Sequence, residues 1–176
     1  MGSLYPEKGI ELFVDSIPEV IKTIPNVKFV IIGTGPLEEK IKNAIKKMNI
    51  KNNVNFIGHV KSREEIFKIL LECSVGVAPY FVKKNSYTSF GFGAKVIDYM
   101  ACGLPVIICH WKEIEKLGLG LTINYDSKEM SPSIIKLLTD KTFFMNCHEN
   151  VLTYVKSHYY KNVYNDAFKK IGFKIN

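Results

Sequence analysis

Short, nearly continuous apolar runs alternate along the chain with segments in which apolar residues recur at helical spacing. The apolar runs are typical of strands that are buried on both faces of a parallel sheet, and the helical spacing predicts amphipathic helices. We expect strands at 27–32, 54–58, 75–79, 105–108 and 119–123. We expect helices at 9–24, 36–48, 62–71, 94–101, 131–138, 140–154 and 160–171, and a short amphipathic turn or helix at 111–115. This alternation predicts an α/β fold, a Rossmann-like parallel sheet with helices on both faces and additional C-terminal helices.

Capping residues and prolines mark several of the expected helix ends. Ser62 and Glu65 form a capping box, which predicts a helix that begins directly after Ser62. Asp140 is expected to cap the long helix that follows it. Pro18 lies inside the first helical stripe and should kink or loosen that helix. Ser131–Pro132 is expected to begin a short helix of its own.

Turns rich in glycine follow the expected strands. They are Gly33–Thr34–Gly35 after the first strand, Gly58–His59 after the second, Pro79–Tyr80 after the third, and the loop that precedes Ala94. The carboxyl ends of parallel strands meet at one edge of the sheet, and ligands of such folds bind there. We therefore expect these turns to converge on one ligand site. His59 is a candidate contact to the base or sugar of a nucleotide, with a surface histidine as the alternative.

The clearest candidate for an anion site is the turn that precedes the expected helix 94–101. The turn consists of Phe90, Gly91, Phe92 and Gly93, and the helix begins with Ala94 and Lys95. Glycines let a ligand approach the backbone closely, and the free N–H groups of a helix N-terminus bind phosphate. Asp98 lies one turn further on, where its carboxylate could accept hydrogen bonds from ribose hydroxyls. The alternative is an ordinary glycine turn before a half-buried helix with one solvated acid.

Composition narrows the classes of partner. The chain has 176 residues, of which 47% are hydrophobic, and this is enough for one compact domain. No apolar run approaches the roughly 20 residues that a membrane span needs. The net charge of +7 comes almost wholly from lysines spread over every segment, and Arg63 is the only arginine. Because arginine is the preferred reader of bases and phosphates, we expect no nucleic-acid partner.

The cysteines do not suggest a metal site. Cys73, Cys102, Cys109 and Cys147 form no closely spaced pair and have no histidine partner at the spacing of a zinc site. Each of them lies in an apolar or helical context. We therefore expect no metal, and free thiols in a reducing cytosol.

Four motifs together resemble one known family. They are the Gly2–Gly9 stretch GSLYPEKG, the turn Gly33–Thr34–Gly35–Pro36, the strand end Phe56–Ile57–Gly58, and the stretch from Gly91 to Val106. Over residues 2–140 the chain resembles the C-terminal, donor-binding half of a GT-B glycosyltransferase of the retaining group 1 (family 4) type. The resemblance implies one Rossmann-like nucleotide-sugar-binding domain over residues 1–176, without the acceptor half.

The resemblance also implies roles for individual residues. Lys8 would neutralise the diphosphate of the donor, and the backbone at Phe92, Gly93 and Ala94 would hold the distal phosphate and the transferred sugar. Asp98 would bind the ribose hydroxyls. Two positions depart from the family pattern, because Ser3 stands where the family has an arginine and Phe90 stands where it has the glutamate that contacts the sugar.

The function expected from the resemblance is transfer of a sugar from a nucleoside diphosphate sugar to an acceptor, with retention and without a metal or other cofactor. The acceptor would be a sugar, lipid or polysaccharide held by the missing half, so the isolated domain should bind nucleotide without turnover. We expect a cytoplasmic protein, with peripheral attachment of the full protein to the inner face of the membrane left open. A non-catalytic nucleotide-binding module and one half of a nucleotide-sugar epimerase are the alternatives.

Overall fold

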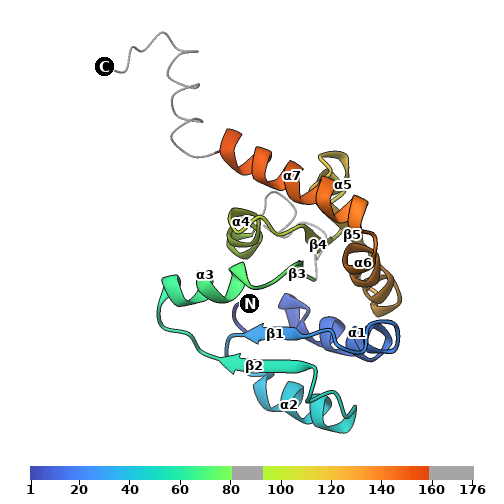
Figure 1. Ribbon diagram of the computed structural model, residues 1–176. Coiled ribbons are helices and arrows are strands. Elements are labelled where there is room, and N and C mark those ends of the chain that lie inside the picture. Colours follow the sequence, from blue (N-terminus) through green and yellow to red (C-terminus); the bar gives the residue numbers. More distant parts are fainter. Residues whose placement is uncertain (81–92, 159–176) are drawn as a thin grey trace.

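The computed structural model describes residues 1–80 and 93–158 (Figure 1). In chain order the elements are η1 (Pro6–Lys8), α1 (Ile10–Thr23), β1 (Phe29–Ile32), α2 (Glu38–Lys47), β2 (Val54–Gly58), α3 (Arg63–Leu71), β3 (Gly76–Ala78), α4 (Ala94–Ala101), β4 (Val106–Cys109), α5 (Glu113–Lys116), β5 (Gly120–Ile123), α6 (Ser127–Thr139) and α7 (Lys141–Ser157). The expected helix at 160–171 lies outside the described residues. Strands and helices alternate as the apolar pattern predicts.

All strand pairs among the described residues are parallel, and they form two pieces of sheet. One piece has the order β1–β2 and the other the order β3–β4–β5. The pairing Phe29↔Val54 begins the first piece, and Val77↔Ile107 and Ile107↔Leu121 run through the second. Parallel strands joined by helices are the expected Rossmann-like arrangement, and its division into two pieces is a feature that the sequence did not predict.

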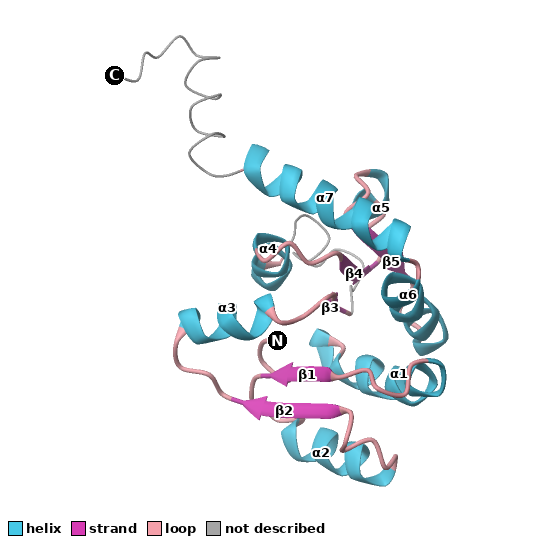
Figure 2. Ribbon diagram, viewed as in Figure 1, coloured by secondary structure: helices cyan, strands magenta, loops and turns pink. Residues whose placement is uncertain are grey.

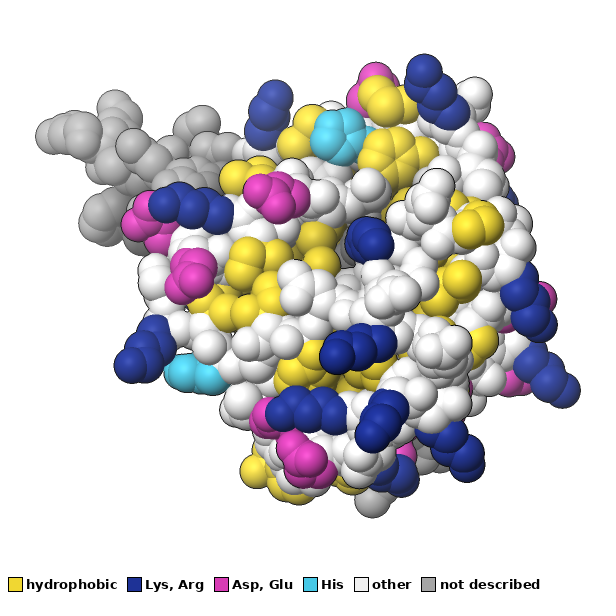
Figure 3. Space-filling model, turned by 60° about the horizontal axis from the view of Figure 1, so that its bottom comes forward, with side chains coloured by type: hydrophobic (Ala, Val, Ile, Leu, Met, Phe, Trp, Pro, Cys, Tyr) yellow, Lys and Arg dark blue, Asp and Glu magenta, His cyan; other side chains and the backbone are white. Residues whose placement is uncertain are grey.

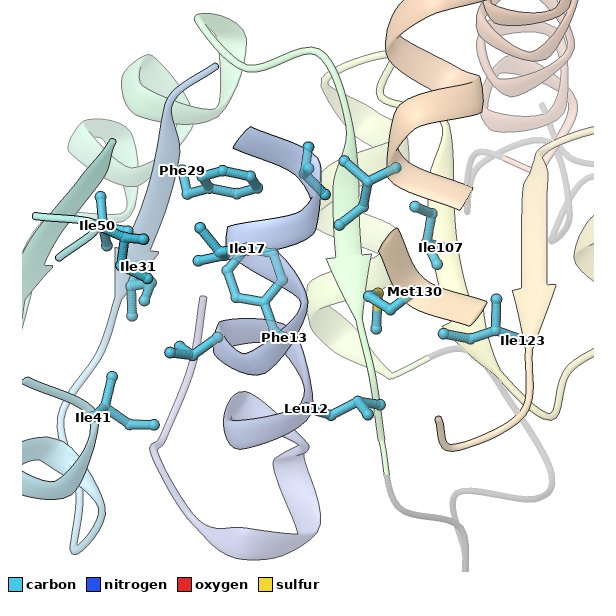
Figure 4. Close-up of a cluster of buried hydrophobic side chains, with 14 of the residues drawn as sticks. Leu12, Phe13, Ile17, Phe29, Ile31, Ile41, Ile50, Ile107, Ile123 and Met130 are labelled. Atoms are coloured by element: carbon cyan, nitrogen blue, oxygen red, sulfur yellow. The ribbon is translucent and has the colours of Figure 1, made fainter. Parts of the chain in front are cut away.

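Helices cover both faces of the sheet. Alternate residues of a strand point to opposite faces, and in β4 Ile107 and Val106 belong to two different buried clusters. The Ile107 cluster includes residues of α1, α2, α6 and α7, and the Val106 cluster includes residues of α3, α4, α5 and α7. Figure 4 shows the first cluster, in which Phe13 and Ile17 of α1 lie next to Phe29 of β1. The rings of Phe13 and Phe29 meet edge to face with centroids 5.7 Å apart.

Several predicted helix ends are confirmed. Helix α4 spans Ala94–Ala101 as expected. The Ser62 hydroxyl accepts a hydrogen bond from the Glu65 N–H at the start of α3, and the Asp140 carboxylate accepts one from the Phe143 N–H at the start of α7. Local capping chemistry therefore sets these boundaries.

The predicted helix start at Ser131–Pro132 is wrong. Helix α6 begins at Ser127, because the Asp126 carboxylate caps it by accepting from the Lys128 N–H at 2.9 Å. Ser131 is buried inside the helix, and its hydroxyl is within hydrogen-bond distance of the Ser16 carbonyl of α1 at 3.1 Å. Helix α1 likewise continues through Pro18. In both helices tertiary packing outweighs the N–H that proline lacks.

Candidate functional site

The expected site lies where β1 and β2 end. In Figure 2 the arrowheads of both strands point toward the side on which α3 and the first residues of the chain lie. The residues that come together there belong to segments far apart in the sequence. They are Gly2, Lys8, Gly33, Tyr80, Gly93 and Lys95.

Two lysines share one aromatic ring at the centre of this site. The ammonium nitrogens of Lys8 and Lys95 lie 5.6 Å and 4.6 Å from the centroid of the Tyr80 ring. Burial and the charge of Lys8 lower the pKa of Lys95 to about 8, and burial raises the pKa of Tyr80 to about 12. Within residues 1–80 and 93–158, neither lysine has a carboxylate partner. Both lysines line the same cavity, and two ammonium groups close together make its wall positively charged, which favours an anionic ligand.

The N-terminus of α4 adds hydrogen-bond donors to the two lysines. Gly93 is the N-cap residue and provides no side-chain cap, so within residues 1–80 and 93–158 the first N–H groups of the helix, at Ala94 and Lys95, have no capping partner. A Cβ atom at Gly93 would lie 2.5 Å from the Tyr80 hydroxyl oxygen, so a larger residue at this position would have to displace the Tyr80 ring. The predicted anion-binding residues Gly93, Ala94 and Lys95 therefore lie together with Lys8.

The structure gives Gly33 and Gly35 a packing role. Gly33 has a φ of +137°, and an added Cβ would lie 1.8 Å from the carbonyl oxygen of Gly2. At Gly35 the added atom would lie 2.7 Å from the carbonyl oxygen of Leu4. Both glycines admit the backbone of Gly2–Leu4 alongside the end of β1. Contact of either glycine with a ligand stays a prediction.

Asp98 is engaged by an ion pair. The Arg63 Nη2 atom at the start of α3 donates to Asp98 Oδ1 at 2.6 Å, and the guanidinium group also lies 5.4 Å from the centroid of the Phe67 ring. The Asp98 side chain is 14% exposed and that of Arg63 is 75% exposed. Among residues 1–80 and 93–158, Arg63 is the only ion-pair partner of Asp98, and the contact uses Oδ1. Contact of the second oxygen, Oδ2, with a ligand stays a prediction.

The other predicted residues are placed as follows. Gly58 has a φ of +78° at the end of β2, and its carbonyl accepts a hydrogen bond from the Gly33 N–H at 2.7 Å. His59 is exposed next to it. Phe90, Gly91 and Phe92 lie outside the described residues.

Sequence reasoning missed two features of the site. The first is Arg63, which a capping box had marked only as the start of a helix. The second is the pairing of Lys95 with Lys8, because lysines are scattered through the whole sequence. On the face seen in Figure 3, basic side chains in dark blue lie across the surface with acidic ones in magenta among them. Only the fold distinguishes the two site lysines from the others.

No group of three or more His, Cys, Asp or Glu residues in residues 1–80 and 93–158 is arranged to hold a metal ion. The four cysteines are free, and burial raises the pKa of each thiol. None of the described helices is both long enough and apolar enough to span a membrane.

The parallel sheet with helices on both faces is the Rossmann-like fold of the C-terminal domain of a GT-B enzyme. Solved structures show the same fold. The C-terminal domain of a glycosyl transferase group 1 family protein from Francisella tularensis superposes with a TM-score of 0.77 at 18% identity, over 90% of this chain and 83% of that domain. The pneumococcal O-GlcNAc transferase GtfA, solved with UDP and GlcNAc, gives a TM-score of 0.77 at 16% identity, over 97% of this chain and 34% of that one.

The chain belongs to the glycosyl transferases group 1 family, whose sequence model matches residues 1–140. An uncharacterized glycosyltransferase of Methanocaldococcus jannaschii is 32% identical over 107 residues. That match covers 61% of this chain and 26% of the relative. The chain thus spans about a quarter to a third of the length of these full-length proteins.

Proposed function

We propose that this chain is the donor-binding domain of a retaining group 1 glycosyltransferase and that it binds a nucleoside diphosphate sugar without a metal ion. The observation that carries the proposal is the placement of Lys8 and Lys95 around Tyr80, beside the uncapped N-terminus of α4. The UDP in the solved pneumococcal transferase supports a nucleotide ligand for this fold.

The two lysines would act on the leaving group. Breaking the bond between the sugar's anomeric carbon and the diphosphate oxygen leaves both bonding electrons, and therefore negative charge, on the diphosphate. Ammonium groups and helix N–H groups that face this oxygen stabilise that charge without a proton transfer. The acceptor would be held by the remainder of a longer protein, and the oxygen of its hydroxyl would form the new bond on the same face of the sugar that the diphosphate leaves. The proton of that hydroxyl would pass to the departing diphosphate oxygen.

Lys95 could supply the positive charge that the family has in an arginine at the position of Ser3. The Lys95 Nζ atom lies 3.6 Å from the position of a Cβ atom on Gly2, which is the neighbour of Ser3. The second positive charge of the diphosphate site would therefore come from α4 instead of from the N-terminal stretch. This arrangement favours a binding-competent site over a degenerate one.

The test is calorimetric titration with UDP, GDP and ADP, their sugar conjugates and inorganic pyrophosphate, on the native chain and on Asp98→Ala. We expect one nucleoside diphosphate to bind and Asp98→Ala to weaken it by roughly tenfold, the effect of one lost charged hydrogen bond of about 1.4 kcal/mol. Pyrophosphate has no ribose, so its affinity should be the same in both proteins. Equal nucleotide affinity in the two proteins would contradict the ribose role of Asp98.

The affinity for the diphosphate should also depend on pH through Lys95. Its pKa of about 8 in the free site means that the ammonium is charged below pH 8 and neutral above it. A bound anion favours the charged form, so we expect affinity to be highest below pH 8 and to fall by up to tenfold per pH unit above it. Titrations at pH 7, 8 and 9 with whichever of UDP, GDP and ADP binds at pH 7 measure this, and Lys95→Arg should flatten the profile because arginine stays charged.

Releasing Asp98 from its ion pair should tighten nucleotide binding. Because Arg63 is 75% exposed, its pair with Asp98 is worth at most about 1 kcal/mol, and Arg63→Ala should change stability by no more than that. We expect Arg63→Ala to raise nucleoside diphosphate affinity about threefold and to leave pyrophosphate affinity unchanged. A loss of nucleotide affinity would instead show that Arg63 itself contacts the ligand.

A further inference from the structure

Two lysines differ in burial from the other lysines of the described chain. Lys8 and Lys95 are half-buried, whereas every other lysine in residues 1–80 and 93–158 is exposed. An ammonium group that leaves water loses its hydration, so burial is unfavourable unless another group attracts the cation. Within the described ranges no carboxylate pairs with either lysine. An interaction other than an ion pair with a described residue must therefore hold these ammonium groups in place.

The aromatic ring of Tyr80 is the group that both ammonium nitrogens share. Lys8 Nζ lies 5.6 Å and Lys95 Nζ 4.6 Å from the ring centroid, and a ring attracts a cation within roughly 6 Å. Tyr80 is 7% exposed, and burial raises the pKa of its hydroxyl to about 12, so the side chain is uncharged at neutral pH. The attraction between a ring and a cation is stronger away from water.

Backbone contacts fix the ring relative to the segment that carries Lys8. The Tyr80 N–H donates to the Ala78 carbonyl at 2.9 Å, in a tight turn at the end of β3. Gly9 follows Lys8 and packs so closely on Pro79 that an added Cβ would lie 1.6 Å from the Pro79 carbonyl oxygen. The place of the ring beside Lys8 is therefore set by packed backbone and does not depend on the lysine side chain.

The hydroxyl end of the ring meets the first turn of α4. A Cβ atom on Gly93 would lie 2.5 Å from the Tyr80 hydroxyl oxygen and 3.0 Å from the ring carbon that carries it. Gly93 is the N-cap of α4, and Lys95 is two residues further on. Tyr80 thus lies against both segments that carry the half-buried lysines.

We propose that Tyr80 is a positioning residue of the diphosphate site, whose ring holds the ammonium groups of Lys8 and Lys95 together before the anion binds. This inference rests on the proposed function of the site. A lysine side chain is a flexible four-carbon stem, and two like charges repel each other. Without the ring, each ammonium group would turn toward water. Ordering both of them would then oppose binding.

The test measures binding of inorganic pyrophosphate, which has the diphosphate but no nucleoside or sugar. Chemical shifts of the Ala94 and Lys95 amides follow the titration at pH 7, because they also report weak binding. Tyr80→Phe keeps the ring and removes the hydroxyl, whereas Tyr80→Leu and Tyr80→Met are two independent ways to remove the ring. The matched control is Phe143→Leu, which removes a ring that lies 4.3 Å from Lys136 Nζ. Thermal unfolding checks that each variant is folded.

We expect Tyr80→Leu and Tyr80→Met to weaken pyrophosphate binding by about tenfold. Tyr80→Phe and Phe143→Leu should stay within about twofold of the native chain. An equal loss in Tyr80→Phe would assign the effect to the hydroxyl and overturn the proposal. Native affinity in both ringless variants would overturn it as well.

A double-mutant comparison separates positioning from a structural role of the ring. In a chain that carries Lys8→Gln and Lys95→Gln, no ammonium group is left for the ring to hold. Adding Tyr80→Leu to that chain should change pyrophosphate affinity by no more than about twofold. A further loss of about tenfold would show that the ring supports the site without the lysines, and this would contradict the proposal.

The nucleotide titrations keep this inference apart from the proposed function. If the ringless variants lose pyrophosphate binding as expected but none of UDP, GDP and ADP binds the native chain, the role of Tyr80 stands and the donor-binding function is contradicted. If a nucleotide binds and the ringless variants bind pyrophosphate as the native chain does, the donor-binding function stands and the role of Tyr80 is contradicted. Absence of pyrophosphate binding to the native chain would overturn the role of Tyr80.

Discussion

Replacing both Lys8 and Lys95 by glutamine is expected to weaken binding of the preferred nucleoside diphosphate by about 100-fold. Each lysine should contribute about 1.4 kcal/mol, or roughly tenfold, because the ammonium groups lie at a partly buried site without a carboxylate partner. The two single variants should each lose about tenfold. Titration calorimetry at pH 7, where Lys95 is charged, measures all three.

The matched control for this prediction is Lys46→Gln. Lys46 is exposed near the end of α2, and its replacement lowers the net charge by the same amount. The affinity of this variant for the nucleoside diphosphate should equal that of the native chain. If Lys46→Gln weakened binding as much as Lys8→Gln, the loss would come from the lower net charge of the protein. Direct binding of the diphosphate by Lys8 and Lys95 would then be contradicted.

Gly9→Ala is expected to cost about 3 kcal/mol or more of folding stability. Gly9 has a φ of +69°, and an added Cβ would lie 1.6 Å from the carbonyl oxygen of Pro79. The backbone must therefore move at the junction that places Lys8 beside Tyr80. For a domain of this size we expect the melting temperature to fall by roughly 10 °C. Thermal and urea unfolding measure the loss.

Gly58→Ala separates the two causes of the stability loss in Gly9→Ala, which are the positive φ and the contact with Pro79. Gly58 has a similar φ of +78°, but nothing lies within 4 Å of an added Cβ. We expect only the conformational cost of about 1 kcal/mol. If both variants lost the same stability, the contact between Gly9 and Pro79 would not matter, and backbone conformation alone would explain the effect.

Local signals in the sequence were sufficient for most elements of the fold. The run Val106–Ile108 predicts a buried strand because apolar side chains on both faces need cover on both faces. Helix α4 has its predicted bounds because Gly93 and Gly103 punctuate an amphipathic stretch. The start of helix α6 was misjudged because Asp126 caps it instead of Ser131, and the buried Ser131 hydroxyl contacts α1 across 115 residues.

The sequence by itself thus determined the order of strands and helices, the family, and the candidate residues at the carboxyl ends of the strands. Each of these follows from neighbours in the chain, through periodicity, capping and glycine spacing. Only the tertiary structure decided that Lys95 lies with Lys8 beside the Tyr80 ring and that Arg63 forms an ion pair with Asp98. It also decided that the described strands form two pieces of sheet, with no pairing between β1 and β3. These depend on which distant segments meet, because charge pairing and strand pairing are set by distance in space.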